Sequence, residues 1–301
     1  MKKHIQKIIV MVLVIALIAS VGVNVYLLIG DDTSSRSYLE NPNQIYIMES
    51  GILSNNLDYG VGEDIALQYD FDKEEYAQLI NQYKINDIAK TGTEFEQVKN
   101  LMNEFSRRLY HYSNYDNHID MNAIALLEYS LDNKKNGINC RSKSQILNEM
   151  CLALGIYARK VWIMPYSNYD TECHVVNEIW DTSLNKWIMF DITNNQYWVD
   201  DKGMPLSILE IREKGALQEF CTPIIPGESL SDLKKIKEQH MSEFIYIMKN
   251  VVYTEYCDTY TTGESEKYYV LMPENIKTDY EYLISEKAVQ SSPIKYVKKL
   301  H

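Results

Sequence analysis

The spacing of the apolar residues changes at Gly155, and this change limits what the chain can fold into. Before Gly155, apolar side chains recur at helical spacing, for example at Ile146, Leu147 and Met150. After Gly155 come three runs rich in Val, Ile, Trp and Tyr, the residues that strands prefer. A group of helices followed by a group of strands predicts an α+β domain.

Capping motifs and turn residues divide the chain further. Thr93 with Glu96 and Ser207 with Glu210 match the capping box that opens a helix, and Asp72 with Glu75 resembles it. Glycines stand where two helices should end, at 155 and 215. The sequence predicts helices at 73–86, 94–110, 121–129, 140–154, 207–215 and 231–241, and strands at 157–165, 172–180, 186–192, 246–260 and 267–272.

The amino terminus has the pattern of a membrane anchor. Three lysines precede an uncharged run of 22 residues from Ile8 to Ile29, which is long enough to span a bilayer. Because basic flanks stay in the cytoplasm, the rest of the chain is expected outside the cell membrane. The alternative is a cleaved signal peptide, since small residues occur at 16, 19 and 20. The apolar run continues beyond these residues, which favours the anchor.

We expect four segments along the chain: an anchor at 1–30, a stalk or linker at 31–60, a core domain at 61–215 and a C-terminal helix with a β-hairpin at 216–301. The formal net charge is −12, from 30 basic and 42 acidic residues. This acidity argues against nucleic acid as a partner. An acidic surface also does not adhere to anionic lipid, so the N-terminal helix is the expected contact with the membrane.

Five cysteines are too few for a disulfide scaffold in a chain of this length, although Cys221 and Cys257 could pair. Cys140 is different, because a turn at Gly137 delivers it to the start of the helix that ends near Gly155. The positive end of a helix dipole favours thiolate over thiol, and thiolate is the reactive form. The alternative is a small buried residue with no chemical role.

The candidate partners of Cys140 lie on two successive strands. His174 belongs to the second predicted strand, and Asp191 belongs to the third. If paired residues have numbers that sum to 365 or 367, the two side chains share one face of the hairpin. An even sum would separate them. A carboxylate on one imidazole nitrogen would orient the ring, and the other nitrogen could take the proton of a thiol.

Four pieces of this sequence resemble the transglutaminase-like core: Gly137-x-x-Cys140, Leu152–Arg159, His174–Glu178 and Trp187–Thr193. The resemblance implies a papain-like cysteine fold and acyl transfer through a thioester. It implies Cys140 as the nucleophile, His174 as base and acid, and Asp191 as the residue that orients the histidine.

Two positions depart from the usual family pattern. Val176 stands where the family usually has an aromatic residue, with Asn177 after it, and Ile192 stands where proline is common. Neither change removes a reacting group. The backbone N–H of Cys140 is the expected oxyanion donor, and a side chain from the polar loop 111–118 could be a second.

A zinc site can be drawn from Cys140, Cys173, His174 and Asp191. Adjacent strand residues point to opposite faces, and paired Cys-x-x-Cys spacing is lacking, so we expect no metal and no cofactor. The same reasoning disfavours Cys173 as the nucleophile, because a strand interior does not lower the pKa of a thiol. Calcium is not implied by any acidic loop motif.

The sequence therefore predicts a cysteine-dependent acyl transfer on amide or peptide bonds outside the cell membrane, with hydrolysis favoured over protein crosslinking. The expected partner is a peptide or protein substrate at the cell surface or cell wall. The alternative is a catalytically idle domain that binds surface peptides or proteins.

Overall fold

The computed structural model describes residues 42–167, 172–229, 239–265, 267–276 and 289–292, and the single residues 11, 170 and 235. The chain divides into two compact units, Met1–Met48 and Glu49–His301, and the fold below is that of the second. The predicted membrane segment 8–29 lies outside the described residues, apart from Met11. Within the described ranges, no helix is long and apolar enough to cross a bilayer.

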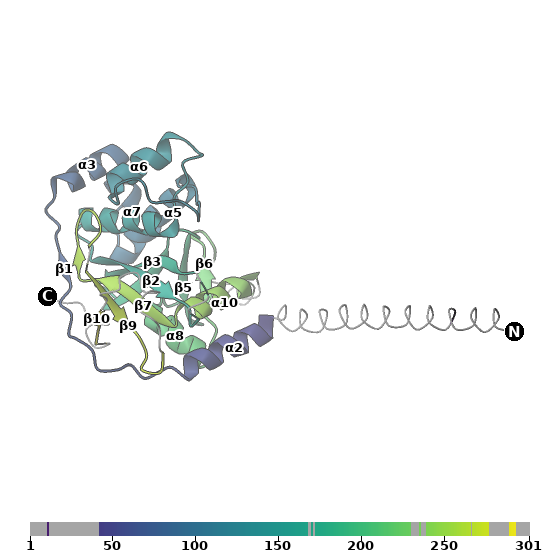
Figure 1. The fold of residues 1–301 in the computed structure, drawn as a ribbon. Helices are drawn as coiled ribbons and strands as arrows, with labels where there is room; N and C mark the ends of the chain where they lie inside the picture. Colours follow the sequence, from purple (N-terminus) through teal and green to yellow (C-terminus); the bar gives the residue numbers. More distant parts are fainter. Residues whose placement is uncertain are drawn as a thin grey trace. The chain divides into compact units, whose positions relative to one another are not determined.

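A mixed sheet forms the centre of the second unit (Figure 1). In the described part of the chain it has eight strands in the order β10-β9-β7-β2-β3-β4-β5-β6, and β10 and β9 are its parallel pair. The strands are β2 (Ala158–Met164), β3 (His174–Asp181), β4 (Lys186–Asp191), β5 (Gln196–Val199), β6 (Thr222–Ile224), β7 (Tyr253–Cys257), β9 (Tyr268–Leu271) and β10 (Val289–Gln290). A separate parallel pair joins β1 (Gln68–Tyr69) to β8 (Thr259–Tyr260).

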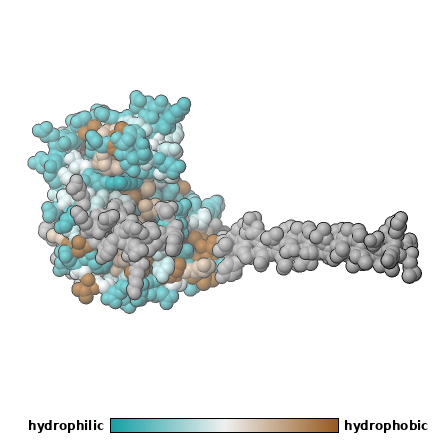
Figure 2. Space-filling view, in the orientation of Figure 1, coloured by the Kyte–Doolittle hydropathy of each residue, from teal (hydrophilic) through white to brown (hydrophobic). Residues whose placement is uncertain are grey.

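Helices cover the sheet, and Figure 1 shows α5 and α7 on one side of it and α8 on the other. The helices of the described ranges are α2 (Pro42–Ser54), which begins in the first unit, and α3 (Glu74–Tyr83), α4 (Ile85–Ala89), α5 (Glu94–Arg108), α6 (Ala123–Asp132), α7 (Cys140–Ala153), α8 (Ile208–Ala216) and α10 (Met241–Asn250) in the second. The apolar stripe of α5 packs on α7 and on the sheet residues Ile188 and Phe190 to form the core. Hydrophilic residues cover most of the surface around α3 and α6 in the view of Figure 2. The helices and the largely antiparallel sheet together confirm the predicted α+β class.

The helix signals were only partly correct. Both capping boxes, at Thr93 and at Ser207, are present. The prediction for Asp72 is wrong, because Lys73 is the N-cap of α3 and its side chain makes no capping bond. Lys84 adopts the left-handed conformation (φ 58°) and divides the predicted helix 73–86 into α3 and α4. Gly155 ends α7 with φ 71° as expected, whereas Gly215 lies inside α8 and does not end it.

The two ends of the second unit also differ from the prediction. The segment 31–60 is not all linker, since it contains α2, where Leu53 is buried. The predicted strand 246–260 begins later, because residues 241–250 form α10, with Phe244, Ile247 and Met248 buried. The predicted helix 231–241 lies almost wholly outside the described residues. The segment 216–301 is more than an extension, because β7 pairs directly with β2 inside the main sheet.

Candidate active site

Cys140 is the first residue of α7, as the sequence predicts. The side chain of Asn139 caps the helix by accepting a hydrogen bond from the backbone N–H of Ser142 at 3.0 Å. Before the cap, a methyl group on Gly137 would lie 2.8 Å from Cβ of Tyr112, so only glycine fits this close approach. The turn and the cap together fix where the thiol enters the site.

The register of the β-hairpin brings His174 and Asp191 together. Asn177 pairs with Phe190, so the partner numbers sum to 367, one of the two registers that would place both side chains on one face. His174 and Asp191 are therefore diagonal neighbours on one face. Nε2 of His174 lies 2.9 Å from Oδ2 of Asp191, and the two side chains are 5% and 1% exposed. The buried carboxylate holds the imidazole in one orientation.

Both oxygens of Asp191 accept further hydrogen bonds. Oδ1 accepts the backbone N–H groups of Thr193 (3.0 Å) and Asn194 (3.2 Å), and Oδ2 accepts the side-chain amide of Asn194 at 2.8 Å. Burial raises the pKa of Asp191, but the positive charge of His174 and these donors lower it below its usual value. Asp191 is therefore ionised at neutral pH. Sequence reasoning missed Asn194, because nothing marks a turn asparagine as a partner of the preceding aspartate.

The thiol of Cys140 is hydrogen-bonded to His174 and receives the backbone N–H of Val175. Because Nε2 of the imidazole faces Asp191, Nδ1 remains for the thiol. Burial raises the pKa of Cys140, and the hydrogen bond and charge of His174 lower it by more, so the pKa lies below its usual value. Burial lowers the pKa of His174, while Asp191 and Cys140 raise it to about 10. These directions favour a thiolate–imidazolium pair at neutral pH.

The other four cysteines also lie in the described part of the chain, and none of the five is in a disulfide. Burial raises the pKa of Cys173 to about 11 and that of Cys221 and Cys257 to about 12. The pairing that the sequence left open for Cys221 and Cys257 is therefore absent. Cys140 is the one thiol of the five whose pKa is lowered.

A cleft of about 570 Å³ opens beside the imidazole. Its walls include His111, Asn194, Gln196 and Tyr246, together with Thr193, Ser242, Glu243 and Ile247. The ring of Tyr246 packs edge-on against His174, with centroids 5.8 Å apart. Sequence reasoning missed Tyr246, because the sequence predicts a strand from residue 246 where the structure has α10. Of the candidate triad, His174 is the residue that lines this cleft.

His111 brings the polar loop 111–118 to the cleft wall. Its Nε2 lies 3.0 Å from Oγ of Ser113. Burial lowers the pKa of His111, and the positive charges of Lys143 and His174 lower it further. The imidazole of His111 is thus neutral at neutral pH and can donate one N–H. Its role as the second oxyanion donor stays a prediction.

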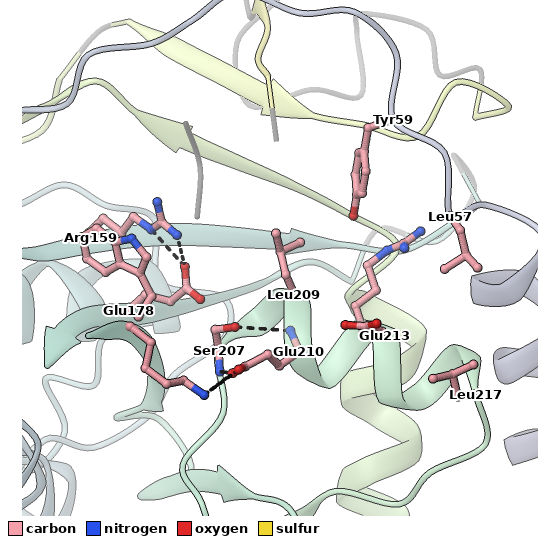
Figure 3. A pocket seen from close by; sticks show the side chains of 12 residues that line it. Leu57, Tyr59, Arg159, Glu178, Ser207, Leu209, Glu210, Glu213 and Leu217 are labelled. Atoms are coloured by element: carbon pink, nitrogen blue, oxygen red, sulfur yellow. Dashed lines mark hydrogen bonds and ion pairs between the residues drawn. The ribbon is translucent and has the colours of Figure 1, made fainter. Parts of the chain in front are cut away.

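A second cavity, of about 520 Å³, lies against α8 (Figure 3). Glu178 accepts two hydrogen bonds from the guanidinium of Arg159, at 2.9 and 2.6 Å, and a third from the backbone N–H of Ile208 at 2.8 Å. Nε of Arg212 donates to the carbonyl of Val252 at 3.1 Å. The buried charged groups of this cavity are thus engaged within the fold, and no residue of the candidate triad lines it. The chemistry belongs to the cleft beside His174.

Metal chemistry has no donor set in the described ranges, where no group of three or more His, Cys, Asp and Glu side chains is arranged to hold an ion. Cys173 directly precedes β3, so it lies outside the strand in which the sequence placed it.

Comparison with known proteins agrees with the resemblance seen in the sequence. Residues 82–192 match the model of the transglutaminase-like superfamily, and the match includes Cys140, His174 and Asp191. No curated protein matches the chain significantly.

Two solved structures are weakly similar. A candidate cysteine protease from Cytophaga hutchinsonii is 17% identical over 45% of this chain and 43% of its own, with a TM-score of 0.31. A Rad4–Rad23 complex bound to a 6-4 photoproduct UV lesion is 14% identical over 72% of this chain and 53% of its own, with a TM-score of 0.22. The chain thus spans about half the length of each structure, and these scores are too low to bear on function.

Proposed function

We propose that this chain, whose residues 82–192 carry a transglutaminase-like core, transfers acyl groups from amide or peptide bonds through a thioester on Cys140. One observation carries the proposal: a thiol of lowered pKa starts a helix and is hydrogen-bonded to an imidazole whose other nitrogen faces a buried carboxylate. Nucleophile, base and orienting group have the geometry that such chemistry requires.

The reaction has two halves. The Cys140 thiolate attacks the substrate carbonyl, forming the S–C bond, and the imidazolium of His174 gives its proton to the leaving nitrogen as the C–N bond breaks. Water then attacks the thioester carbonyl while His174 takes a proton from it. The S–C bond breaks, the acid leaves and the thiolate returns. The backbone N–H of Cys140, at the first turn of α7, is free to stabilise the oxyanion in both halves.

Hydrolysis is favoured over transfer to an amine. The cleft is lined largely by polar side chains, including Asn194, Gln196, Ser242 and Glu243. A polar, open cleft admits water to the thioester, whereas transfer to an amine requires that water be excluded. We therefore infer peptidase-like cleavage of a peptide or protein. Its place outside the cell membrane is part of the proposal and is supported by the apolar run 8–29.

The test measures alkylation of the five thiols in the full-length protein. Iodoacetamide at pH 6 should label Cys140 faster than the other four cysteines, and the His174→Ala variant should lose this selectivity. Cys173 is the matched internal control, because it is next to His174 in sequence and is also partly exposed. Equal, slow labelling of all five thiols would contradict the proposal and favour the idle binding domain.

A peptide library then tests for turnover. New amino termini that form with wild-type protein and not with Cys140→Ala would establish hydrolysis. Incorporation of a labelled amine without cleavage would instead establish crosslinking.

A further inference from the structure

The cavity against α8 contains a buried cation that has no carboxylate partner. Three basic side chains line this cavity: Arg159, Lys186 and Arg212. Arg159 pairs with Glu178 at 2.6 Å, and Lys186 pairs with Glu210 at 2.5 Å. Within the residues that the structure describes, no carboxylate forms an ion pair with Arg212, although this side chain is only 3% exposed. A buried charge without a counter-charge is costly, so a negatively charged ligand would be favoured at this position.

The guanidinium of Arg212 also keeps free hydrogen-bond donors. Its Nε donates to the carbonyl of Val252 at 3.1 Å, and its Nη2 donates to the carbonyl of Asn56. A guanidinium carries five N–H groups, so three of them, including both on Nη1, have no acceptor in the described part of the chain. The two carbonyls hold the side chain in place and are themselves uncharged. The remaining N–H groups suit the two oxygens of a carboxylate.

Tyr59 supplies a further donor beside this guanidinium. The guanidinium carbon of Arg212 lies 5.4 Å from the centroid of the Tyr59 ring. Figure 3 shows Tyr59 reaching into the cavity with its hydroxyl directed toward α8. This hydroxyl has no hydrogen-bond partner among the described residues. A phenol O–H can donate to the same anion that a guanidinium binds.

Much of the remaining wall of the cavity is apolar. It is formed by Leu57, Leu209, Leu217 and the ring of Trp187. Leu57 and Leu217 are 46% and 61% exposed, so apolar surface is open to solvent beside the cavity. The volume of about 520 Å³ lies within the range of about 300–1,000 Å³ that is usual for small-molecule sites. Apolar walls with a few polar groups are also the usual composition of such sites.

We propose that this cavity binds a small carboxylate with an apolar body. The carboxylate would accept hydrogen bonds from Arg212 and Tyr59, and the body would lie along the leucines. A monoanion is favoured over a phosphate, because the exposed carboxylate of Glu213 in the same wall repels additional negative charge. The site shares no residue with the cleft beside His174, so the inference does not depend on the proposed function.

The experiment is calorimetric titration of the full-length protein with three ligands that have the same apolar body: octanoate, octanol and octylamine. Octanoate should bind about tenfold more tightly than the other two. Arg212→Met should weaken octanoate binding about tenfold and leave octanol binding unchanged, because hydrogen bonds from a charged group are lost. Tyr59→Phe should weaken octanoate binding about threefold. Glu213→Gln should strengthen it about twofold.

Lys214→Met is the matched control. It also removes a positive charge from α8, but Lys214 pairs with Glu219 at 2.8 Å and does not line the cavity. Octanoate binding to this variant should stay within about twofold of wild type. Melting curves show whether Arg212→Met is folded. Leu209→Trp provides an independent test, because it keeps Arg212, fills the cavity and should abolish octanoate binding.

Several results would overturn the inference. These are no binding of octanoate, equal affinity for octanoate and octanol, or tighter binding of octylamine. Unchanged octanoate binding in Leu209→Trp or in folded Arg212→Met, or an equal loss in Lys214→Met, would also overturn it. Tighter binding of octyl phosphate than of octanoate would refute the choice of a carboxylate. None of these measurements involves Cys140, so the proposed function stands or falls separately by its own labelling test.

Discussion

Replacement of Asp191 by asparagine should disable the site while preserving its shape. Each oxygen of Asp191 accepts two hydrogen bonds, Oδ1 from the backbone N–H groups of Thr193 and Asn194, and Oδ2 from Asn194 and His174. In either orientation of the new asparagine amide, its NH₂ would take the place of a carboxylate oxygen and would face two hydrogen-bond donors. Asp191→Asn therefore loses two hydrogen bonds as well as the negative charge.

The magnitude follows from these contacts. A hydrogen bond to a charged group contributes about 1.5–3 kcal/mol, so two contribute about 3–6 kcal/mol. If the amide turns its NH₂ toward His174, Nε2 must accept that hydrogen bond, so the ring proton moves to Nδ1. A protonated Nδ1 can no longer take the proton of the thiol. We expect the rate of acyl transfer to fall about 10²- to 10⁴-fold, because each factor of ten corresponds to about 1.4 kcal/mol.

The assay is alkylation of Cys140 at pH 6, followed by single-turnover cleavage once a substrate is found. Asp181→Asn is the matched control. Asp181 is equally buried and accepts backbone N–H groups of Phe95 (3.0 Å) and Leu184 (2.9 Å), but it lies at the other end of β3. The Asp181→Asn variant should be less stable than wild type, and its Cys140 thiol should remain reactive. A loss of less than tenfold in Asp191→Asn, or an equal loss in Asp181→Asn, would refute the reasoning.

Three other substitutions test the fold and its titration. The pKa of His174 is raised in the folded state to about 10, from about 6.5 in the unfolded chain. The protonated imidazole therefore contributes its full stabilisation below about pH 6.5, and this contribution declines as the pH rises to about 10. Urea denaturation should show this decline in wild type and not in His174→Gln. Glu178→Gln leaves the Arg159 guanidinium buried without its carboxylate, so the free energy of unfolding should fall by about 3–5 kcal/mol, with Cys140 still reactive. Gly137→Ala forces a methyl group against Tyr112, and calorimetry should show a loss of about 1–3 kcal/mol.

The sequence was informative where short patterns decide local structure. Alternation along the two strands showed that an odd register would bring His174 and Asp191 to one face, and the observed sum of 367 does so. The position of Cys140 at a helix start followed from a glycine turn and an apolar stripe. These are local features, and the residues that produce them are close together in the sequence.

Features that depend on packing between distant segments could not be predicted. Tyr246 contacts His174 from a helix about 70 residues further along the chain, and its own neighbourhood is rich in residues that also favour strands. Lys143 looked like an ordinary polar residue on a helix, because sequence alone does not show that this face is covered. The left-handed Lys84 likewise carries no signal, since lysine rarely adopts that conformation.

The contact between α7 and β3 explains how a departure from the family pattern is accommodated. Oγ of Ser144 donates to the carbonyl of Val175 at 2.9 Å, and the side-chain amide of Asn177 donates to the carbonyl of Ser144 at 2.9 Å. These two buried bonds fix the helix against the strand one turn after Cys140 and directly after His174. Asn177, which looked unusual in the sequence, therefore ties the element that carries the thiol to the element that carries the imidazole.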